Sequence, residues 1–116
     1  MTNKDGVSLV TNALAGSMGM FPDKDANNAA IRYFNNDYFT QTPYSESWVV
    51  DWFIKAGRLD LAINTIRAYW GKMVGNGATS IYEKYNPETY FPDESIESYS
   101  HAWGCGPVYE YPKIFK

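Results

Sequence analysis

The sequence of 116 residues contains one cysteine, one histidine and no long apolar run. A single cysteine, Cys105, excludes an intrachain disulfide and a zinc site built from two or four cysteines. Its place between Gly104 and Gly106 favours a small residue that fills a tight position over a nucleophile. The single histidine, His101, has no second histidine at a metal-binding spacing, so we expect no metal and no other cofactor.

Basic residues are also few: ten Lys and Arg face thirteen Asp and Glu, which gives a formal net charge of −3. This balance argues against nucleic acid and an anionic membrane surface as partners. Apolar runs such as Trp48–Val50 are far too short to cross a bilayer. The polar start Met1–Gly6 lacks the apolar core of a signal peptide, which leaves the localisation unassigned.

Aromatic residues, by contrast, are abundant, with four Trp, ten Tyr and six Phe making 17% of the chain. Tyrosine is in excess, and its ring tolerates contact with water on one side. The composition therefore fits either a polar binding cleft or a large interface with a partner. The length allows one domain at most, covering residues 1–116.

Apolar residues recur at helical spacing in four segments, which predict helices over 7–18, 25–34, 45–56 and 60–74. Ser45 is a plausible N-cap of the third helix, and Pro43 places residues 38–44 in a loop. Gly57 ends this helix, and the short turn after it predicts that the third and fourth helices form an αα-hairpin.

The helical period is lost after Gly75–Gly77. Residues 78–82 could form a short strand or an extended segment. The segment 86–97, which is rich in acidic residues, is typical of a surface loop. A last helix starting at Ser98 or Ser100 would end before Pro112. The sequence thus predicts an all-α domain with a long irregular loop, and the aromatics of this loop favour function over disorder.

One carboxylate of this loop, Glu83, lies between Tyr82 and Tyr85. Glycosidic bonds are cleaved by carboxyl groups, and sugar rings stack on aromatic side chains, so this pattern is typical of a sugar-cleaving pocket. On the local pattern alone, a solvated loop carboxylate is the commoner outcome. His101, next to Trp103, is likewise more often structural, but it could donate a hydrogen bond to a sugar hydroxyl.

The third predicted helix carries an aromatic row and two acids. Tyr44, Trp48 and Trp52 are four residues apart, which favours helix packing over a ligand platform. Glu46 and Asp51 fall on other faces of this helix and are expected to be solvated charges.

Five segments agree in order and spacing with one known family. The first two are Thr42–Tyr44 and Ala56–Ala62, and the others are Ile66–Trp70, Gly77–Glu83 and Ser100–Pro107. Together, over about Thr42 to Tyr109, the chain resembles the C-terminal part of the catalytic domain of bacterial α-L-rhamnosidases. These are six-hairpin glycosidases of glycoside hydrolase family 78. The run ending in Glu83 combined with the later Ser-His-Ala-Trp sequence carries most of the resemblance.

This resemblance implies an (α/α)₆ toroid of which the chain supplies the last two or three hairpins. It implies an inverting hydrolase in which Glu83 is the general base that activates water. His101 would contact the bound rhamnose, and Trp103 and Tyr82 would form pocket walls. Position 82 is Tyr where the family usually has Trp, which keeps the pocket aromatic. The general acid belongs to an earlier motif of the family that these residues do not contain.

An inverting mechanism needs two carboxyl groups about 6.5–9.5 Å apart, and one of them is missing here. We therefore expect the isolated chain to lack useful rhamnosidase activity. A piece of a closed toroid also leaves two hydrophobic edges, which predicts self-association or burial against the remainder of the catalytic domain.

Two alternatives remain open at this point. The chain could be a non-catalytic sugar-binding or assembly module built from helical hairpins, in which Glu83 is replaceable. More remotely, it could belong to another six-hairpin hydrolase with a different sugar substrate.

Overall fold

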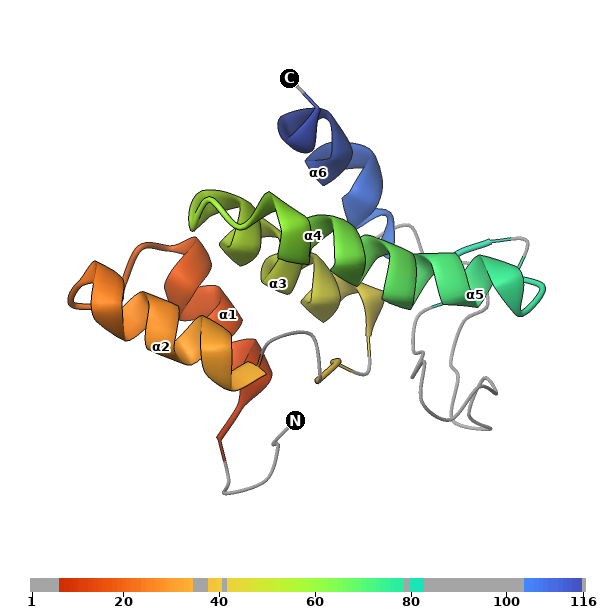
Figure 1. The fold of residues 1–116 in the computed structure, drawn as a ribbon. Coiled ribbons are helices and arrows are strands. Elements are labelled where there is room, and N and C mark those ends of the chain that lie inside the picture. Colours follow the sequence, from red (N-terminus) through yellow and green to blue (C-terminus); the bar gives the residue numbers. More distant parts are fainter. Residues whose placement is uncertain (1–6, 35–37, 41, 79, 83–103, 116) are drawn as a thin grey trace.

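A computed structural model describes residues 7–34, 38–40, 42–78, 80–82 and 104–115 of the protein. Within these ranges the regular elements are all helical, which confirms the all-α prediction for that part of the chain (Figure 1). The elements are α1 (Leu9–Ser17), α2 (Lys24–Phe34), α3 (Pro43–Lys55), α4 (Leu59–Ile66), the π-helical segment η2 (Arg67–Gly71), α5 (Lys72–Gly75) and α6 (Gly106–Ile114). Among the described residues, none of these helices has the length and apolar character needed to traverse a bilayer.

Helix α3 begins two residues earlier than the sequence indicates, so the prediction of Ser45 as its N-cap is wrong. The N-cap is Thr42, whose hydroxyl oxygen accepts a hydrogen bond from the Ser45 backbone N–H at 3.1 Å. Pro43 forces the preceding residue into the extended conformation, which is the conformation of an N-cap. Proline itself is well suited to the first helical position, where its missing N–H has no helical partner to lose.

Helix α3 ends as predicted at a glycine, because Gly57 adopts a left-handed φ of 77°. The predicted helix over 60–74 is present, but it is interrupted by the π-helical segment η2. The adjacent side chains of Tyr69 and Trp70 in this segment are both buried. Such π-helical bulges often occur near functional sites.

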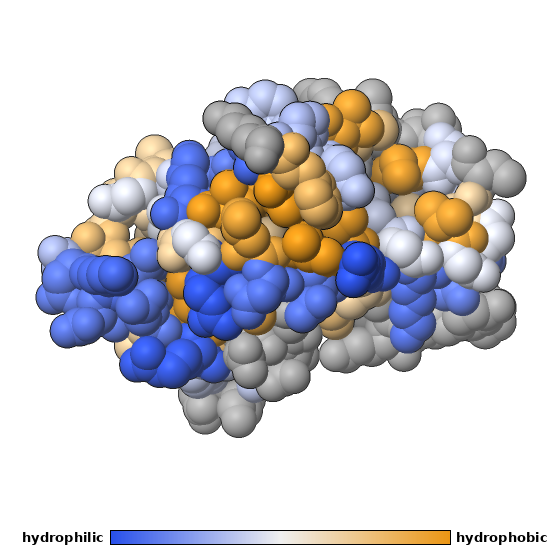
Figure 2. Space-filling model, turned by 45° about the horizontal axis from the view of Figure 1, so that its top comes forward, coloured by the Kyte–Doolittle hydropathy of each residue, from blue (hydrophilic) through white to orange (hydrophobic). Residues whose placement is uncertain are grey.

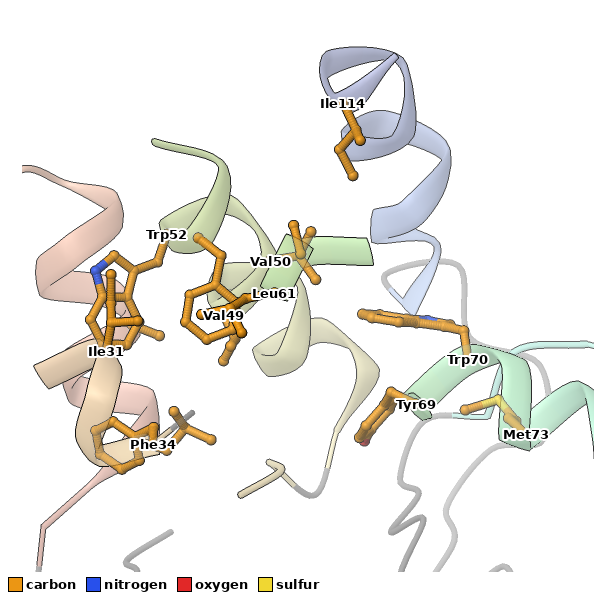
Figure 3. Packing of buried hydrophobic residues seen from close by; sticks show 14 residues of the cluster. Ile31, Phe34, Val49, Val50, Trp52, Leu61, Tyr69, Trp70, Met73 and Ile114 are labelled. Atoms are coloured by element: carbon orange, nitrogen blue, oxygen red, sulfur yellow. The ribbon is translucent and has the colours of Figure 1, made fainter. Parts of the chain in front are cut away.

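Helix α3 lies at the centre of the described fold, in contact with α1, α4 and α6. Helix α1 approaches it closely, because a Cβ atom at Gly16 would overlap the indole ring of Trp52. Trp52 also stacks on Phe21 and meets Phe34 edge to face, and its Nε1 donates to Asn27 Oδ1 at 2.6 Å. Figure 3 shows Trp52 and Phe34 on one side of the core, with Tyr69, Trp70 and Met73 on the other. Part of the aromatic excess therefore serves packing.

Helix α6 packs against α3 and begins only at Gly106, where a Cβ atom would overlap the side chain of Ser47. The predicted starts at Ser98 or Ser100 lie outside the described residues. The prediction that this helix ends before Pro112 is wrong, since α6 runs through it to Ile114. Pro112 lies near the C-terminal end of α6, so the backbone hydrogen bond that it cannot donate is lost only in the last turns. The buried side chain of Ile114 holds this end of the helix against the core.

Apolar side chains remain exposed on several helices. Figure 2 shows hydrophobic surface gathered in the middle of one face, with hydrophilic surface beside it. The large apolar residues that are exposed on the described part of the chain are Met18, Met20, Tyr44, Leu59, Val74, Val108, Tyr109, Tyr111 and Phe115. Four of these belong to α6 or follow it directly, which is more than for any other helix of the described ranges.

Candidate functional site

Of the four site residues predicted from the sequence, the structure describes only Tyr82. Its side chain is half-buried and packs against the hydrophobic core. Glu83, His101 and Trp103 lie outside the described residues. Residues 78 and 80–82 form no strand, so the strand alternative is wrong for them.

The described residues on either side of 83–103 lie against each other at what we call the loop junction, formed by Pro43, Trp70, Ile81 and Gly104. A Cβ atom at Gly104 would overlap the Ile81 side chain and would lie 3.0 Å from Pro43 Cβ. The indole Nε1 of Trp70 donates a hydrogen bond to the Gly104 carbonyl oxygen at 2.8 Å. The two ends of the predicted functional loop are therefore fixed at one place on the fold.

The residue after this junction departs from expectation. Cys105 is exposed and does not fill a tight position, so that prediction is wrong. The close packing belongs instead to its neighbours Gly104 and Gly106, whose missing side chains let α6 start against α3. Within the described ranges, no group of three or more His, Cys, Asp or Glu side chains is arranged to hold a metal ion.

A second feature is a cavity of about 350 Å³ between α3 and α6, which we call the α3–α6 cavity. It has aromatic, acidic and basic side chains in its wall. The lining residues are Tyr44, Ser47, Trp48, Asp51, Lys55, Gly106, Tyr109, Glu110 and Lys113. The cavity was not predicted, because its two walls are contributed by segments about sixty residues apart in the sequence.

Asp51 is the charged centre of this cavity, and the prediction of a solvated carboxylate is wrong. Only 6% of the residue is exposed, and its Oδ2 accepts a hydrogen bond from the Ser17 hydroxyl. Lys55 Nζ lies 2.9 Å from Oδ2, and Lys113 Nζ lies 3.4 Å from Oδ1. Burial raises the pKa of Asp51, but the Ser17 hydrogen bond and the two lysines outweigh it and hold this pKa below its usual value.

Glu110 lies beside this ion pair with a weaker set of partners. Only 5% of the residue is exposed, and its Oε2 accepts no hydrogen bond from the described chain. Lys113 Nζ is 3.2 Å from this oxygen, close enough for charge attraction but outside hydrogen-bond geometry. Burial is the main reason that the pKa of Glu110 is raised, and the negative charge of Asp51 adds to the effect.

The aromatic row of α3 divides between core and cavity. Trp52 is fully buried, as the packing interpretation predicts. Tyr44 is 46% exposed, Trp48 is half-buried, and both line the cavity with their rings edge to face at 6.3 Å. Tyr109 adds a third ring from α6, with Lys113 Nζ 3.9 Å from its centroid. The packing interpretation is thus confirmed for Trp48 as well, since its ring also packs against the core, and it is wrong only for the exposed Tyr44.

A third carboxylate, Glu46, is completely buried near the start of α3, so the expectation of a solvated charge is wrong here too. Its Oε2 accepts a hydrogen bond from the Thr40 backbone N–H at 2.8 Å, while Oε1 has no hydrogen-bond partner among the described residues. Burial raises the pKa of Glu46 to about 7, with the Thr40 hydrogen bonds opposing the shift. The Thr40 carbonyl accepts from the Tyr69 hydroxyl at 3.2 Å, which links this carboxyl to η2.

The comparisons with known proteins add no relative to this picture. No protein-family model, no curated protein and no solved structure matches the chain.

Proposed function

We propose that the chain is part of an inverting α-L-rhamnosidase-like glycoside hydrolase, which removes terminal rhamnose from glycans or glycosides. The proposal rests on the five sequence segments that resemble this family, and on the fixed position of the two loop ends. The wider arrangement, in which the helices form hairpins of an (α/α)₆ toroid, is part of the same proposal.

The observation that carries the proposal is the loop junction. Glu83 is two residues after Ile81, and His101 is three residues before Gly104. Because an extended chain spans at most about 3.6 Å per residue, Glu83 starts within roughly 7 Å of one side of the junction and His101 within roughly 11 Å of the other. Two motifs separated by seventeen residues are thereby tethered to the same point, which supports a shared pocket.

In the proposed reaction Glu83 removes a proton from a water molecule as the water oxygen attacks the anomeric carbon. The bond from this carbon to the leaving oxygen breaks, and its electron pair stays on that oxygen. His101 donates a hydrogen bond to a rhamnose hydroxyl, while Tyr82 and Trp103 form the walls against which the ring packs. The leaving oxygen takes its proton from a carboxylic acid outside these 116 residues.

The mechanism can be tested by separating the base from the missing acid. An alkyl rhamnoside needs a protonated leaving group, so we expect no turnover of it by the isolated chain. A 2,4-dinitrophenyl α-L-rhamnoside releases a phenolate that needs no proton, so we expect slow hydrolysis above background with inversion at the anomeric carbon. Glu83→Gln should return this rate to background.

A matched control is Glu88→Gln, which changes another acid of the same segment and should leave the rate unchanged. An equal rate for the unaltered chain and Glu83→Gln would overturn the catalytic role. If rhamnose still bound both proteins equally, the alternative of a non-catalytic sugar-binding or assembly module would replace it. Turnover of the alkyl rhamnoside that depends on Glu83 would instead contradict the claim that the general acid lies outside these residues.

The partner of this chain follows from the same proposal. The exposed apolar side chains on α6 and at the ends of α1 and α5 fit surfaces that face further hairpins of the catalytic domain. Without them we expect the isolated chain to self-associate, which static light scattering would detect as a mass above that of one chain. A clean monomer that binds little hydrophobic dye would contradict this expectation.

A further inference from the structure

We propose that the α3–α6 cavity is a binding site for a neutral pyranose ring, separate from the pocket assigned to Glu83. Its volume of about 350 Å³ falls within the range of roughly 300–1,000 Å³ that small-molecule sites occupy. The inference rests on described side chains only and does not depend on the proposed hydrolase activity.

The aromatic walls indicate a ligand with an apolar face. Tyr44 and Trp48 of α3 and Tyr109 of α6 all line the cavity, and Tyr109 is 69% exposed. An exposed tyrosine beside a cavity gains stability when another apolar surface covers it. The axial C–H groups of a pyranose provide such a surface, while the hydroxyl groups at its edge remain free for hydrogen bonds.

The polar groups indicate a ligand that both donates and accepts hydrogen bonds. Glu110 is 95% buried in the wall, since its exposed fraction is 5%, yet its Oε2 is not hydrogen-bonded within the described structure. Lys113 attracts this oxygen from 3.2 Å without a hydrogen bond, and a ligand hydroxyl would supply the bond that the buried acceptor lacks. Lys55 and Lys113 supply donors in the same wall.

The charges of the cavity favour a neutral ligand over a charged one. Two carboxylates, Asp51 and Glu110, face two ammonium groups, Lys55 and Lys113, at 2.9–3.4 Å in three close pairs. A cationic ligand would compete with the lysines, and an anionic ligand would meet Asp51 and Glu110. A polyhydroxyl ring interacts with both signs without breaking an ion pair, so it is the best match.

The test is a titration of the ¹⁵N-labelled 116-residue chain with methyl β-D-glucopyranoside, whose axial hydrogens give it two apolar faces. We expect saturable amide shifts confined to residues 44–55 and 106–113, with a dissociation constant in the roughly millimolar range of small, weakly held ligands. The corresponding glucuronide and amino sugar should bind at least threefold more weakly.

Two tyrosines of α6 form a matched pair of variants. Tyr109→Ala removes a cavity wall and should weaken binding at least fivefold, whereas Tyr111→Ala removes an equally large ring that does not line the cavity and should change it less than twofold. Glu110→Leu keeps the size of the side chain but removes the acceptor, and it should also weaken binding at least fivefold. Circular dichroism checks that each variant keeps its helices.

Several results would overturn this site. These are shifts that do not saturate, tighter binding of a charged analogue, or equal loss of affinity in Tyr109→Ala and Tyr111→Ala. Loss of binding in Glu83→Gln but not in Tyr109→Ala would place the sugar in the other pocket, which contradicts this inference and leaves the proposed hydrolase intact. Unchanged binding in Glu83→Gln with loss in Tyr109→Ala supports the α3–α6 site, whatever the outcome of the rhamnoside assay.

Discussion

Two buried carboxylates on the same helix behave in opposite ways. Asp51 and Glu46 are five residues apart on α3, and less than a tenth of each is exposed. Asp51 has a hydroxyl and two lysines around it, and its pKa is lowered. Glu46 has one backbone N–H at its Oε2 and no lysine or arginine among its described partners, and its pKa is raised to about 7.

The difference follows from depth and neighbours together, because Glu46 lies deeper in the fold and also lacks the cations that surround Asp51. Burial opposes ionisation in both, but only Asp51 has cations from its own helix and from α6 to offset it. Asp51 is therefore charged where α3 and α6 face a cavity. Glu46, whose pKa is raised, lies where α3 meets the backbone of Thr40.

The largest expected effect comes from the pH dependence of Glu46. Its pKa rises from 4.5 to about 7 on folding, so the folded state binds the proton more tightly between these values. The free energy of unfolding should fall by roughly 3 kcal/mol as the pH rises through this window, then level off. Glu46→Gln is neutral throughout and should lack this fall, as urea unfolding at pH 4.5, 6 and 7.5 would measure. Parallel curves for both proteins would contradict the burial of a poorly partnered acid.

Asp51 should affect the free energy of unfolding in the opposite direction with pH, and by a smaller amount, as Asp51→Asn would show. Removing the charge leaves Lys55 and Lys113 without their shared partner, so we expect a loss of about 1–3 kcal/mol at pH 7. The folded-state pKa is lowered, so this contribution is present above the usual pKa of 3.8 and disappears as the pH falls below it. A loss that grows on acidification would show that the lysines are not its cause. Thermal unfolding at pH 3 and pH 7 measures the difference.

Lys55→Gln removes one of the two cations and should cost less. The lysine side chain is 54% exposed and pairs with Asp51 at i,i+4, a geometry in which ion pairs contribute about 0.3–0.5 kcal/mol. The Ser17 hydrogen bond, with a smaller contribution from Lys113, should keep the pKa of Asp51 below its ordinary value in this variant. An NMR titration of the Asp51 carboxyl gives the pKa, and a return to 3.8 would show that Ser17 and Lys113 do not hold it down.

The smallest effect on stability is expected for Asp60→Asn, which serves as the control for an exposed acid. This aspartate pairs with Arg58 at 2.9 Å on the open surface. Water and salt screen such exposed pairs, so Asp60→Asn should leave the unfolding midpoint unchanged within error. A shift as large as that of Asp51→Asn would mean that exposed and buried acids contribute alike, and it would contradict the role given to the buried partners of Asp51.

Helices were predictable from this sequence because their signals are local. The apolar spacing of 25–34 and the stop at Gly57 need no knowledge of distant residues, and the structure confirms both. The helix ends near prolines were predicted less accurately. Pro43 begins a helix and Pro112 lies inside one, because a proline is unfavourable only where it removes a needed N–H bond. The hairpin and toroid arrangements stay predictions.

The cavity and the buried acids were not predictable, since they depend on long-range contacts. Nothing near Asp51 in the sequence indicates that Ser17 and Lys113 meet it, 34 and 62 residues away. Glu46 is buried by the segment around Thr40, which the sequence indicates only as a loop. Conversely, the roles of Glu83, His101 and Trp103 come from motifs and resemblance, and they remain predictions on residues outside the described ranges.

The most direct test of a common pocket is a double-mutant cycle on the affinity for L-rhamnose, with Glu83→Gln and His101→Ala. If both side chains line one cavity fixed at the loop junction, their effects on binding should be coupled by at least about 0.5 kcal/mol. Effects that add within about 0.3 kcal/mol would show that the two residues act at separate places. That result would contradict the proposed hydrolase site.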